Sequence, residues 1–240
     1  MTEHARSNLF QSDSIAENYR HYLLPTVFVP WANHLVGSMA LKAGQTVLDV
    51  ASGTGAVARA AATAIGPTGR VIASDFSQGM LAQVSLGADP DGAPIETLEA
   101  PATALAEMKR VLRPGGSIGI VVWVAGMRLE PFDSYGDALR DEGIDEPFRR
   151  AWDFDSFKMT RVRLTKLLAG FDDLTVETTS LRLNWPSVDD AVNGILGTPY
   201  GPVLSALMPE KRDHIVSVLR DWMTASPHPL VTAFTATGRA

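Results

Sequence analysis

The sequence contains no cysteine, which excludes disulfide bonds, cysteine-ligated zinc, iron–sulfur clusters and thiol catalysis. It has no apolar run near the roughly 18 residues that a membrane-spanning helix needs, and no apolar core of a signal peptide follows Met1–Arg6. Basic residues form no cluster, and 21 Lys and Arg against 27 Asp and Glu give a net charge of −6. Because nucleic acids are bound by clustered positive charge, we expect no nucleic-acid partner, and we expect a cytoplasmic location.

The apolar residues are sufficient for one large folded domain, since 45% of the 240 residues are apolar and 20% are charged. Short apolar runs alternate with helical patterns through the first half of the chain. We expect buried strands at 45–51 and 71–74, further strands at 95–99 and 117–124, and helices at 54–65, 77–86 and 102–113. This alternation predicts an α/β fold with a doubly wound, mostly parallel sheet.

Two flanking regions extend this core. Residues 12–41 predict two helices that are broken at Pro25 and Pro30. In the last third of the chain we expect a helix at 155–169, strands at 174–183 and 229–237, and a helical insert at 187–225, so that the two late strands pair antiparallel at the sheet edge. The expected organisation is a single domain with an N-terminal helical cap (1–41), a ligand-binding core (42–125) and C-terminal strands with the insert (126–240).

A glycine-rich turn, Gly53-Thr54-Gly55, follows the first expected strand. Glycines at such a turn let the backbone approach a ligand, and the N-terminus of the next helix favours a negative group there. Roughly 20 residues further on, Asp75 follows the second strand, where an acidic side chain can accept both hydroxyls of a ribose. The two features together predict a ligand that contains adenosine. Because Gly53 to Ala58 also fits the G-x-G-x-x-A dinucleotide pattern, NAD remains an alternative.

Several further segments carry a resemblance to one family. They are Asp49 inside the first strand, Val71–Leu81, Leu105–Val122 and the N-terminal Tyr19–Pro25. With Val47–Gly55, these segments resemble the class I S-adenosylmethionine-dependent methyltransferases, and most of all the small-molecule branch that includes the ubiquinone/menaquinone-biosynthesis enzymes. The resemblance covers most of residues 12–124. It implies a Rossmann-like methyltransferase fold, S-adenosylmethionine as cofactor, S-adenosylhomocysteine as product, and a small, apolar methyl acceptor.

The resemblance also implies roles for individual positions. The methionine part of the cofactor would be surrounded by Asp49, Ala51, Ser52, Gly53 and Gly55, the ribose held by Asp75, and the adenine packed by Phe76 and Met80. Ala51 replaces the first glycine of the family's usual pattern. From the residues themselves, Tyr19 is a candidate for cation–π contact with the sulfonium, and the candidates for the acceptor site are Tyr22, Trp123 and Tyr200.

For some of these residues plain packing is an equal alternative, since Tyr19 and Tyr22 fit the core face of a helix and Trp123 fits a core strand. No catalytic residue is assigned. Candidate bases are His21, His214, His228, Tyr22 and Tyr200, but no pair among them has a catalytic spacing. No cluster of His, Asp and Glu has the spacing of metal ligands, so we expect no metal.

The chain departs from the family between Ala100 and Pro101, where the family's fourth strand and its connections have no counterpart. That strand pairs with the first strand at the centre of the sheet. Its loss would leave the first strand with an unpaired edge or bring the next strand beside it, and would weaken cofactor binding. Two alternatives therefore stay open: a non-catalytic binding protein with the methyltransferase fold, and an NAD(P)-dependent oxidoreductase. The sequence does not indicate the oligomeric state.

Overall fold

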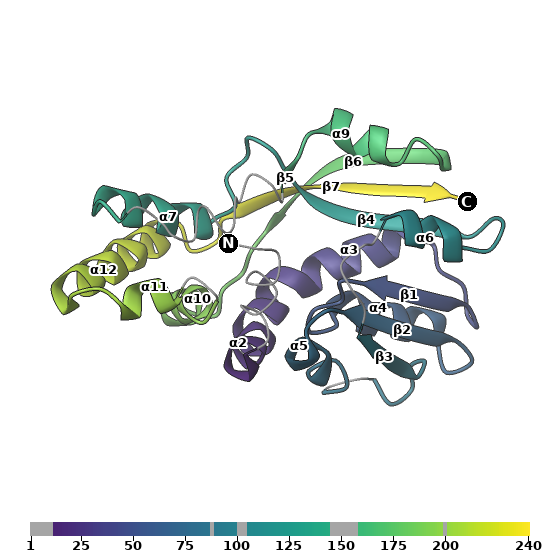
Figure 1. Cartoon of the computed structure of the whole chain (residues 1–240), viewed down its shortest axis with the longest axis horizontal. Coiled ribbons are helices and arrows are strands. Elements are labelled where there is room, and N and C mark those ends of the chain that lie inside the picture. Colours follow the sequence, from purple (N-terminus) through teal and green to yellow (C-terminus); the bar gives the residue numbers. More distant parts are fainter. Residues whose placement is uncertain (1–11, 87–88, 100–104, 145–157, 199–200) are drawn as a thin grey trace.

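A computed structural model describes residues 12–86, 89–99, 105–144, 158–198 and 201–240 (Figure 1). Helices and strands alternate along the chain, which confirms the α/β class. The described strands form two separate sheets, one with the order β1-β2-β3 and one with the order β5-β4-β7-β6. The division into a cap, a core and a C-terminal part remains a prediction.

The first sheet is parallel and confirms three of the expected strands: β1 (Thr46–Val50), β2 (Arg70–Asp75) and β3 (Ile95–Glu99). Helix α4 (Ala56–Ile65) connects β1 to β2, and α5 (Gln78–Ala82) follows β2. The alanine-rich face of α4 packs against the sheet, where Ala58, Ala61 and Ala62 share a buried cluster with Val71 and Ala73 of β2. These small side chains allow the helix to approach the strands closely.

The second sheet confirms the expected antiparallel pairing of the two late strands. It contains β4 (Ser117–Val124), β5 (Lys158–Met159), β6 (Asp172–Arg182) and β7 (Leu230–Arg239). Strand β7 runs antiparallel to both β4 and β6 and lies between them. Helix α6 (Leu105–Val111) precedes β4, and α9 (Arg161–Leu167) follows β5. The helix predicted for 155–169 therefore begins later than expected, at Arg161, because Lys158 and Met159 pair with the end of β4 instead.

The two sheets are not joined by strand pairing anywhere in the described part of the chain. Strand β1 is an edge of its sheet, and the edge of β4 opposite β7 is paired only at Trp123 and Val124, with β5. Of the two consequences expected from the missing strand, the unpaired first strand is the one observed. The prediction that β1 is buried was wrong: Leu48 is 39% exposed, because a strand in a parallel sheet is fully buried only between two neighbours.

The N-terminal segment is one continuous helix whose hydrogen-bonding pattern changes twice. Its three parts are α2 (Asp13–Asn18), the π-helical η2 (Tyr19–Phe28) and α3 (Val29–Met39). The predicted breaks at Pro25 and Pro30 were wrong. Pro30 lies at the start of α3, where the π-helical pattern of η2 changes to an α-helical one, and Pro25 lies within η2. The buried side chains Leu23, Val27 and Trp31 hold this helix against the second sheet, so that packing overrides the helix-breaking tendency of Pro25.

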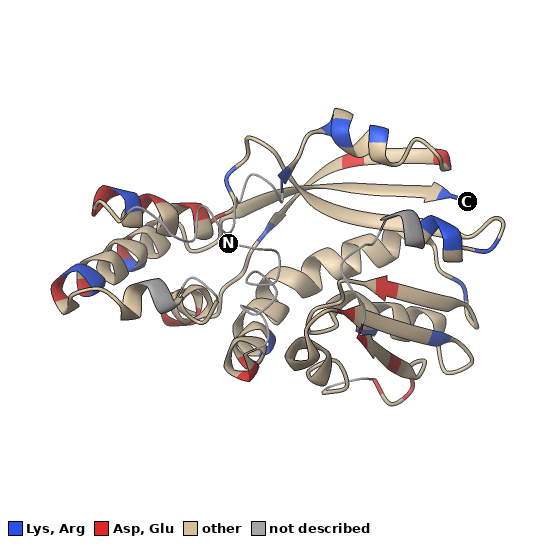
Figure 2. Ribbon diagram, viewed as in Figure 1, with Lys and Arg blue, Asp and Glu red and all other residues tan. Residues whose placement is uncertain are grey.

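A group of helices packs together beyond the end of the second sheet. It contains α7 (Phe132–Asp141), which the sequence analysis did not predict, and the expected helical insert, α10 (Val188–Leu196), α11 (Gly201–Ser205) and α12 (Pro209–Ala225). Acidic and basic residues lie next to one another along α7 and α12 (Figure 2). None of the described helices is both long and apolar enough to cross a bilayer. The cytoplasmic location and the lack of a nucleic-acid partner remain predictions.

Candidate functional site

The glycine-rich turn connects the end of β1 to the start of α4 through three residues with a left-handed backbone. The φ angles are 58° at Ala51, 52° at Gly53 and 85° at Gly55. A Cβ atom on Gly55 would lie 3.0 Å from a methyl carbon of Val84, whereas the space around Gly53 is open. Position 55 therefore requires glycine for its backbone conformation and for its close packing, and position 53 for its conformation alone.

The buried carboxylate of Asp75 fastens this turn to the end of β2. The backbone N–H of Gly53 donates to Oδ2 of Asp75 at 2.8 Å, and the N–H of Ser77 donates to Oδ1 at 3.0 Å. Ser77 in turn caps α5, because its Oγ accepts a hydrogen bond from the N–H of Met80 at 3.2 Å. Asp75, which was predicted to bind a ribose, thus also holds the turn in place. Each of its carboxylate oxygens keeps a second lone pair that can accept a hydrogen bond from a bound molecule.

A second group that holds the turn, Arg59 of α4, was missed from the sequence. Its guanidinium donates to the carbonyl oxygen of Thr54 at 2.7 Å and to that of Val84 at 2.8 Å. These bonds tie the glycine-rich turn to the chain that follows α5. No sequence signal identifies Arg59, because Val84 lies 25 residues away and is brought near by the fold.

Asp49 is the most unusual charged residue of the site. Its side chain is 8% exposed, and its Oδ2 atom has no hydrogen-bond partner; Ser52 Oγ, which is also buried, has none either. Burial raises the pKa of Asp49 to about 7, a backbone hydrogen bond from Ala58 opposes this, and Asp75 adds a smaller increase. A buried carboxylate oxygen without a donor is costly in free energy, so Asp49 is suited to receive a positively charged donor from a ligand.

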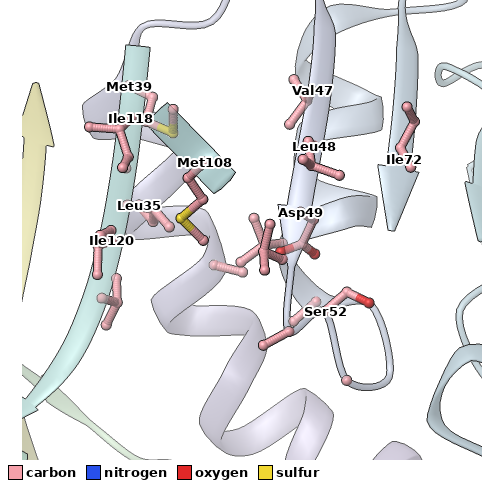
Figure 3. A pocket seen from close by; sticks show the side chains of 18 of the residues that line it. Leu35, Met39, Val47, Leu48, Asp49, Ser52, Ile72, Met108, Ile118 and Ile120 are labelled. Atoms are coloured by element: carbon pink, nitrogen blue, oxygen red, sulfur yellow. The ribbon is translucent and has the colours of Figure 1, made fainter. Parts of the chain in front are cut away.

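Asp49 lines a cavity of about 1200 Å³ that lies between the two sheets (Figure 3). The cavity brings together most of the residues that the sequence analysis selected. Gly55 is not part of its lining and supports the turn from behind. The selected residues that line it are Tyr19, Asp49, Ala51, Ser52, Gly53, Asp75, Phe76, Met80 and Trp123.

Two pairs of aromatic side chains form one wall of the cavity. Tyr19 stacks on Phe28 with ring centroids 5.9 Å apart, and Trp123 meets Trp31 edge to face at 5.7 Å. All four residues line the cavity. Burial raises the pKa of Tyr19 above its usual range. This wall offers apolar and π surfaces to a ligand rather than a base.

Other selected residues lie elsewhere. Tyr22 does not line the cavity; its ring meets His21 at 4.5 Å, and its Cβ lies close to Gly194 of α10. Tyr200 is outside the described residues. His21, His214 and His228 do not belong to the lining either. Within the described lining the titratable side chains are Tyr19, Asp49, Asp75 and Arg113, and the described residues contain no group of three potential metal ligands.

The apolar floor of the cavity was not predicted from the sequence. Leu35 and Met39 of α3 and Met108 of α6 lie between β1 and β4, and Ile118 and Ile120 of β4 also line the cavity (Figure 3). In the sequence these residues look like ordinary core positions of a helix and a strand. They line a cavity because no strand lies between β1 and β4, and the gap after Ala100 was the one signal of this.

Comparison with known proteins identifies the segment that contains the turn. Residues 47–106 match a family described as a methyltransferase domain. The ubiquinone/menaquinone biosynthesis C-methyltransferases of Burkholderia vietnamiensis and Neisseria meningitidis are 27% and 28% identical over 187 and 186 residues. These alignments cover 66% and 65% of this chain, and 70% and 68% of the relatives. The similarities favour neither the oxidoreductase nor the non-catalytic alternative.

Two solved structures are similar to most of this chain at lower sequence identity. A phosphoethanolamine N-methyltransferase of Haemonchus contortus, in complex with S-adenosyl-L-methionine, has a TM-score of 0.47 at 17% identity, over 87% of this chain and 52% of that one. A cyclopropane synthase of Mycobacterium tuberculosis also has a TM-score of 0.47, at 15% identity over 87% and 83% of the two chains. The chain thus spans about half of the Haemonchus enzyme, and the fold described above rests on its own strand order.

Proposed function

We propose that this chain, which belongs to the class I S-adenosylmethionine-dependent methyltransferases, binds its cofactor at the turn of residues 51–55 and methylates a small, apolar molecule. The observation that carries the proposal is the buried carboxylate of Asp49, with Oδ2 unpartnered beside the turn. The cofactor carries an ammonium group on its methionine part, and such a group matches a buried, unpaired carboxylate. No other charged side chain of the described lining combines this burial with an unpartnered oxygen.

The residues around Asp49 support the same assignment. Ser52 Oγ is a second unpartnered acceptor at the turn. The spare lone pairs of Asp75 suit the two hydroxyls of a ribose, and Phe76 and Met80 line the adjacent wall, where an adenine would pack. Tyr19 also lines the cavity, and an aromatic ring there suits a sulfonium. When bound, the cofactor supplies an electrophilic methyl group.

The chain's contribution to the reaction is then orientation and exclusion of water. The wall of Tyr19, Phe28, Trp31 and Trp123 suits an apolar acceptor, and its rigid rings can align that acceptor with the methyl group. The described lining holds no histidine and no lysine, so the site supports catalysis by alignment rather than by a dedicated histidine base. The relatives named above act in quinone biosynthesis by their names; a ring-containing apolar acceptor fits the aromatic wall of this chain.

Calorimetric titration with S-adenosylhomocysteine tests the cofactor site. We expect one site with micromolar affinity, and at least tenfold weaker binding in Asp49→Asn, which keeps the shape of the side chain but removes its charge. Asp213→Asn is the matched control, because Asp213 is an exposed carboxylate whose partner is its neighbour Arg212. No binding by a folded chain, or equal affinity for all three proteins, would contradict the proposal.

A further inference from the structure

Strands β1 and β4 present unpaired edges to each other across the cavity. Strand β1 pairs with β2 on one side only, and β4 pairs with β7 along residues 117–123. Among the described residues, no backbone or side-chain hydrogen bond reaches the outer edge of β1 or the outer edge of residues 117–122. Each strand therefore turns every second N–H and C=O toward the gap without a protein partner.

The two edges run in the same direction. In Figure 3, Ile118 and Ile120 follow one another along β4 in the same sense as Val47, Leu48 and Asp49 follow one another along β1. One extended strand that enters between them would therefore run parallel to both edges.

The gap between the edges has an apolar floor. Helix α3 crosses it and packs closely on β4: a Cβ on Gly119 would lie 2.5 Å from Sδ of Met39 and 3.1 Å from Leu35. Neither α3 nor β4 carries a Lys, Arg, Asp or Glu, and Figure 2 shows both elements free of charge. We call this gap the strand slot; it is formed by Thr46–Leu48, Ser117–Ile120, Leu35, Met39 and Met108.

We propose that the strand slot takes up an extended, apolar segment of another polypeptide, which adds as a strand parallel to β1 and β4. The apolar floor alone would also suit an acyl chain. An acyl chain, however, would leave the N–H and C=O groups of both edges unpaired and remove them from water, which is costly in free energy. A peptide backbone satisfies both edges, and uncharged side chains on its two faces suit a strand that is buried among helices.

The strand slot continues into the cofactor site at Asp49 but is a separate feature. The inference does not rest on the proposed function, because strand addition is measured without cofactor. A bound strand would cover Leu48, which is 39% exposed in the free chain, and would complete the wall of the cavity beside the turn. Occupation of the strand slot is therefore expected to tighten the binding of S-adenosylhomocysteine, by linkage between the two sites.

The direct test uses a fluorescently labelled peptide, acetyl-Lys-Val-Ile-Val-Ile-Val-Lys-amide, and the full chain. We expect saturable binding by fluorescence anisotropy. We also expect slower hydrogen exchange at the amides of Thr46–Val50 and Ser117–Val122, while the amides of β6 are unchanged. A peptide with proline at the second, fourth and sixth positions keeps an apolar, extended character but loses three N–H donors, and it should bind at least tenfold more weakly.

Two leucine variants locate the binding site on the chain. Leu48→Lys places a charge in the strand slot at a position that is already 39% exposed, and it should weaken peptide binding at least tenfold. Leu230→Lys is the matched control: Leu230 is a strand leucine of β7 that is 53% exposed and lies outside the cavity lining. Circular dichroism and urea unfolding verify that both variants fold.

Three results would overturn the inference. The first is no peptide binding by the folded chain. The second is equal binding of the proline peptide, or binding of decanoate with no protection of the strand amides, which would identify a site for apolar tails. The third is self-association in analytical ultracentrifugation with the same amides already protected, which would make a second copy of this chain the occupant.

Discussion

Strands β1 and β7 have similarly apolar sequences but opposite surroundings. Strand β7 lies between β4 and β6, and its residues Val231–Ala236 are all buried. Strand β1 has a neighbour on one side only, and Thr46 and Leu48 are exposed. The difference shows that the burial of a strand is decided by its neighbours in the sheet, while its apolar composition indicates only that it is suited to be buried.

A negative charge placed on each strand should reveal this difference in burial most strongly. Val231→Asp puts a carboxylate at a fully buried position of β7, and we expect it to reduce the free energy of unfolding by about 5 kcal/mol or to prevent folding. Leu48→Asp puts the same group at the open edge of β1 and should cost about 1 kcal/mol or less. Urea unfolding compares the two, and equal losses would mean that the edge of β1 is covered in solution.

The strands were predictable from sequence because each is a short apolar run bounded by turn residues, as in Gln45–Ala51 and Ser117–Val124. Their order was predictable only in part: the pairing of the two late strands was expected, but the position of β7 between β4 and β6 was not, because β4 pairs with a strand more than 100 residues later. The helix α7 was missed because Phe132–Asp141 mixes charged residues with a few apolar positions, Tyr135, Ala138 and Leu139, that are buried only against other helices.

Asp49 differs from the exposed carboxylates of the chain because its side chain is buried. The pKa of Asp49 is raised to about 7 in the folded chain, from 3.8, so the folded state binds its proton more tightly than the unfolded state. Stability from this group is therefore greatest below pH 4, declines as the pH rises to about 7, and is level above that. A shift of about 3 pH units corresponds to about 4 kcal/mol.

Asp49→Asn should remove this decline. At pH 8 the variant should be more stable than the parent chain by up to about 4 kcal/mol without cofactor, and the difference should vanish near pH 4. Urea unfolding at a series of pH values measures it, with Asp213→Asn as the exposed control. A variant that is less stable than the parent at pH 8 would show that the carboxylate has a partner in the folded chain.

The site residues that are close together in the sequence could be predicted, and those that only the folded chain brings together could not. Asp49 at the end of β1 is followed directly by the turn that contains Gly53 and Gly55, and the spacing to Asp75 follows from one helix and one strand. The residues that complete the site, such as Arg59 with its bond to Val84 and Leu35 on the floor, come together through packing. Tyr22 was selected beside Tyr19 on the same segment, but η2 turns it toward α10 instead.

Within the turn, replacing each of the two glycines by alanine should destabilise the chain by different, smaller amounts. Gly55→Ala combines a φ of 85° with a Cβ that would lie 3.0 Å from Val84, and we expect it to cost about 2 to 3 kcal/mol and to weaken cofactor binding. Gly53→Ala has open space around its Cβ and should cost about 1 kcal/mol, from its backbone conformation alone. Thermal unfolding and calorimetric titration compare them; an equal cost would show that Val84 moves aside.

The smallest expected effect is a gain at Ala51. Its φ of 58° is left-handed, a conformation in which a Cβ is strained, and its side chain is exposed, so the methyl group contributes little packing. Ala51→Gly removes the strain but adds freedom to the unfolded chain, and the balance should stabilise the protein by about 0.5 to 1 kcal/mol. Ala60→Gly, inside α4, should have the opposite sign, at about 1 kcal/mol of destabilisation. Because the chemical change is identical, opposite signs in thermal unfolding would show that residue 51 keeps its left-handed backbone in the folded chain.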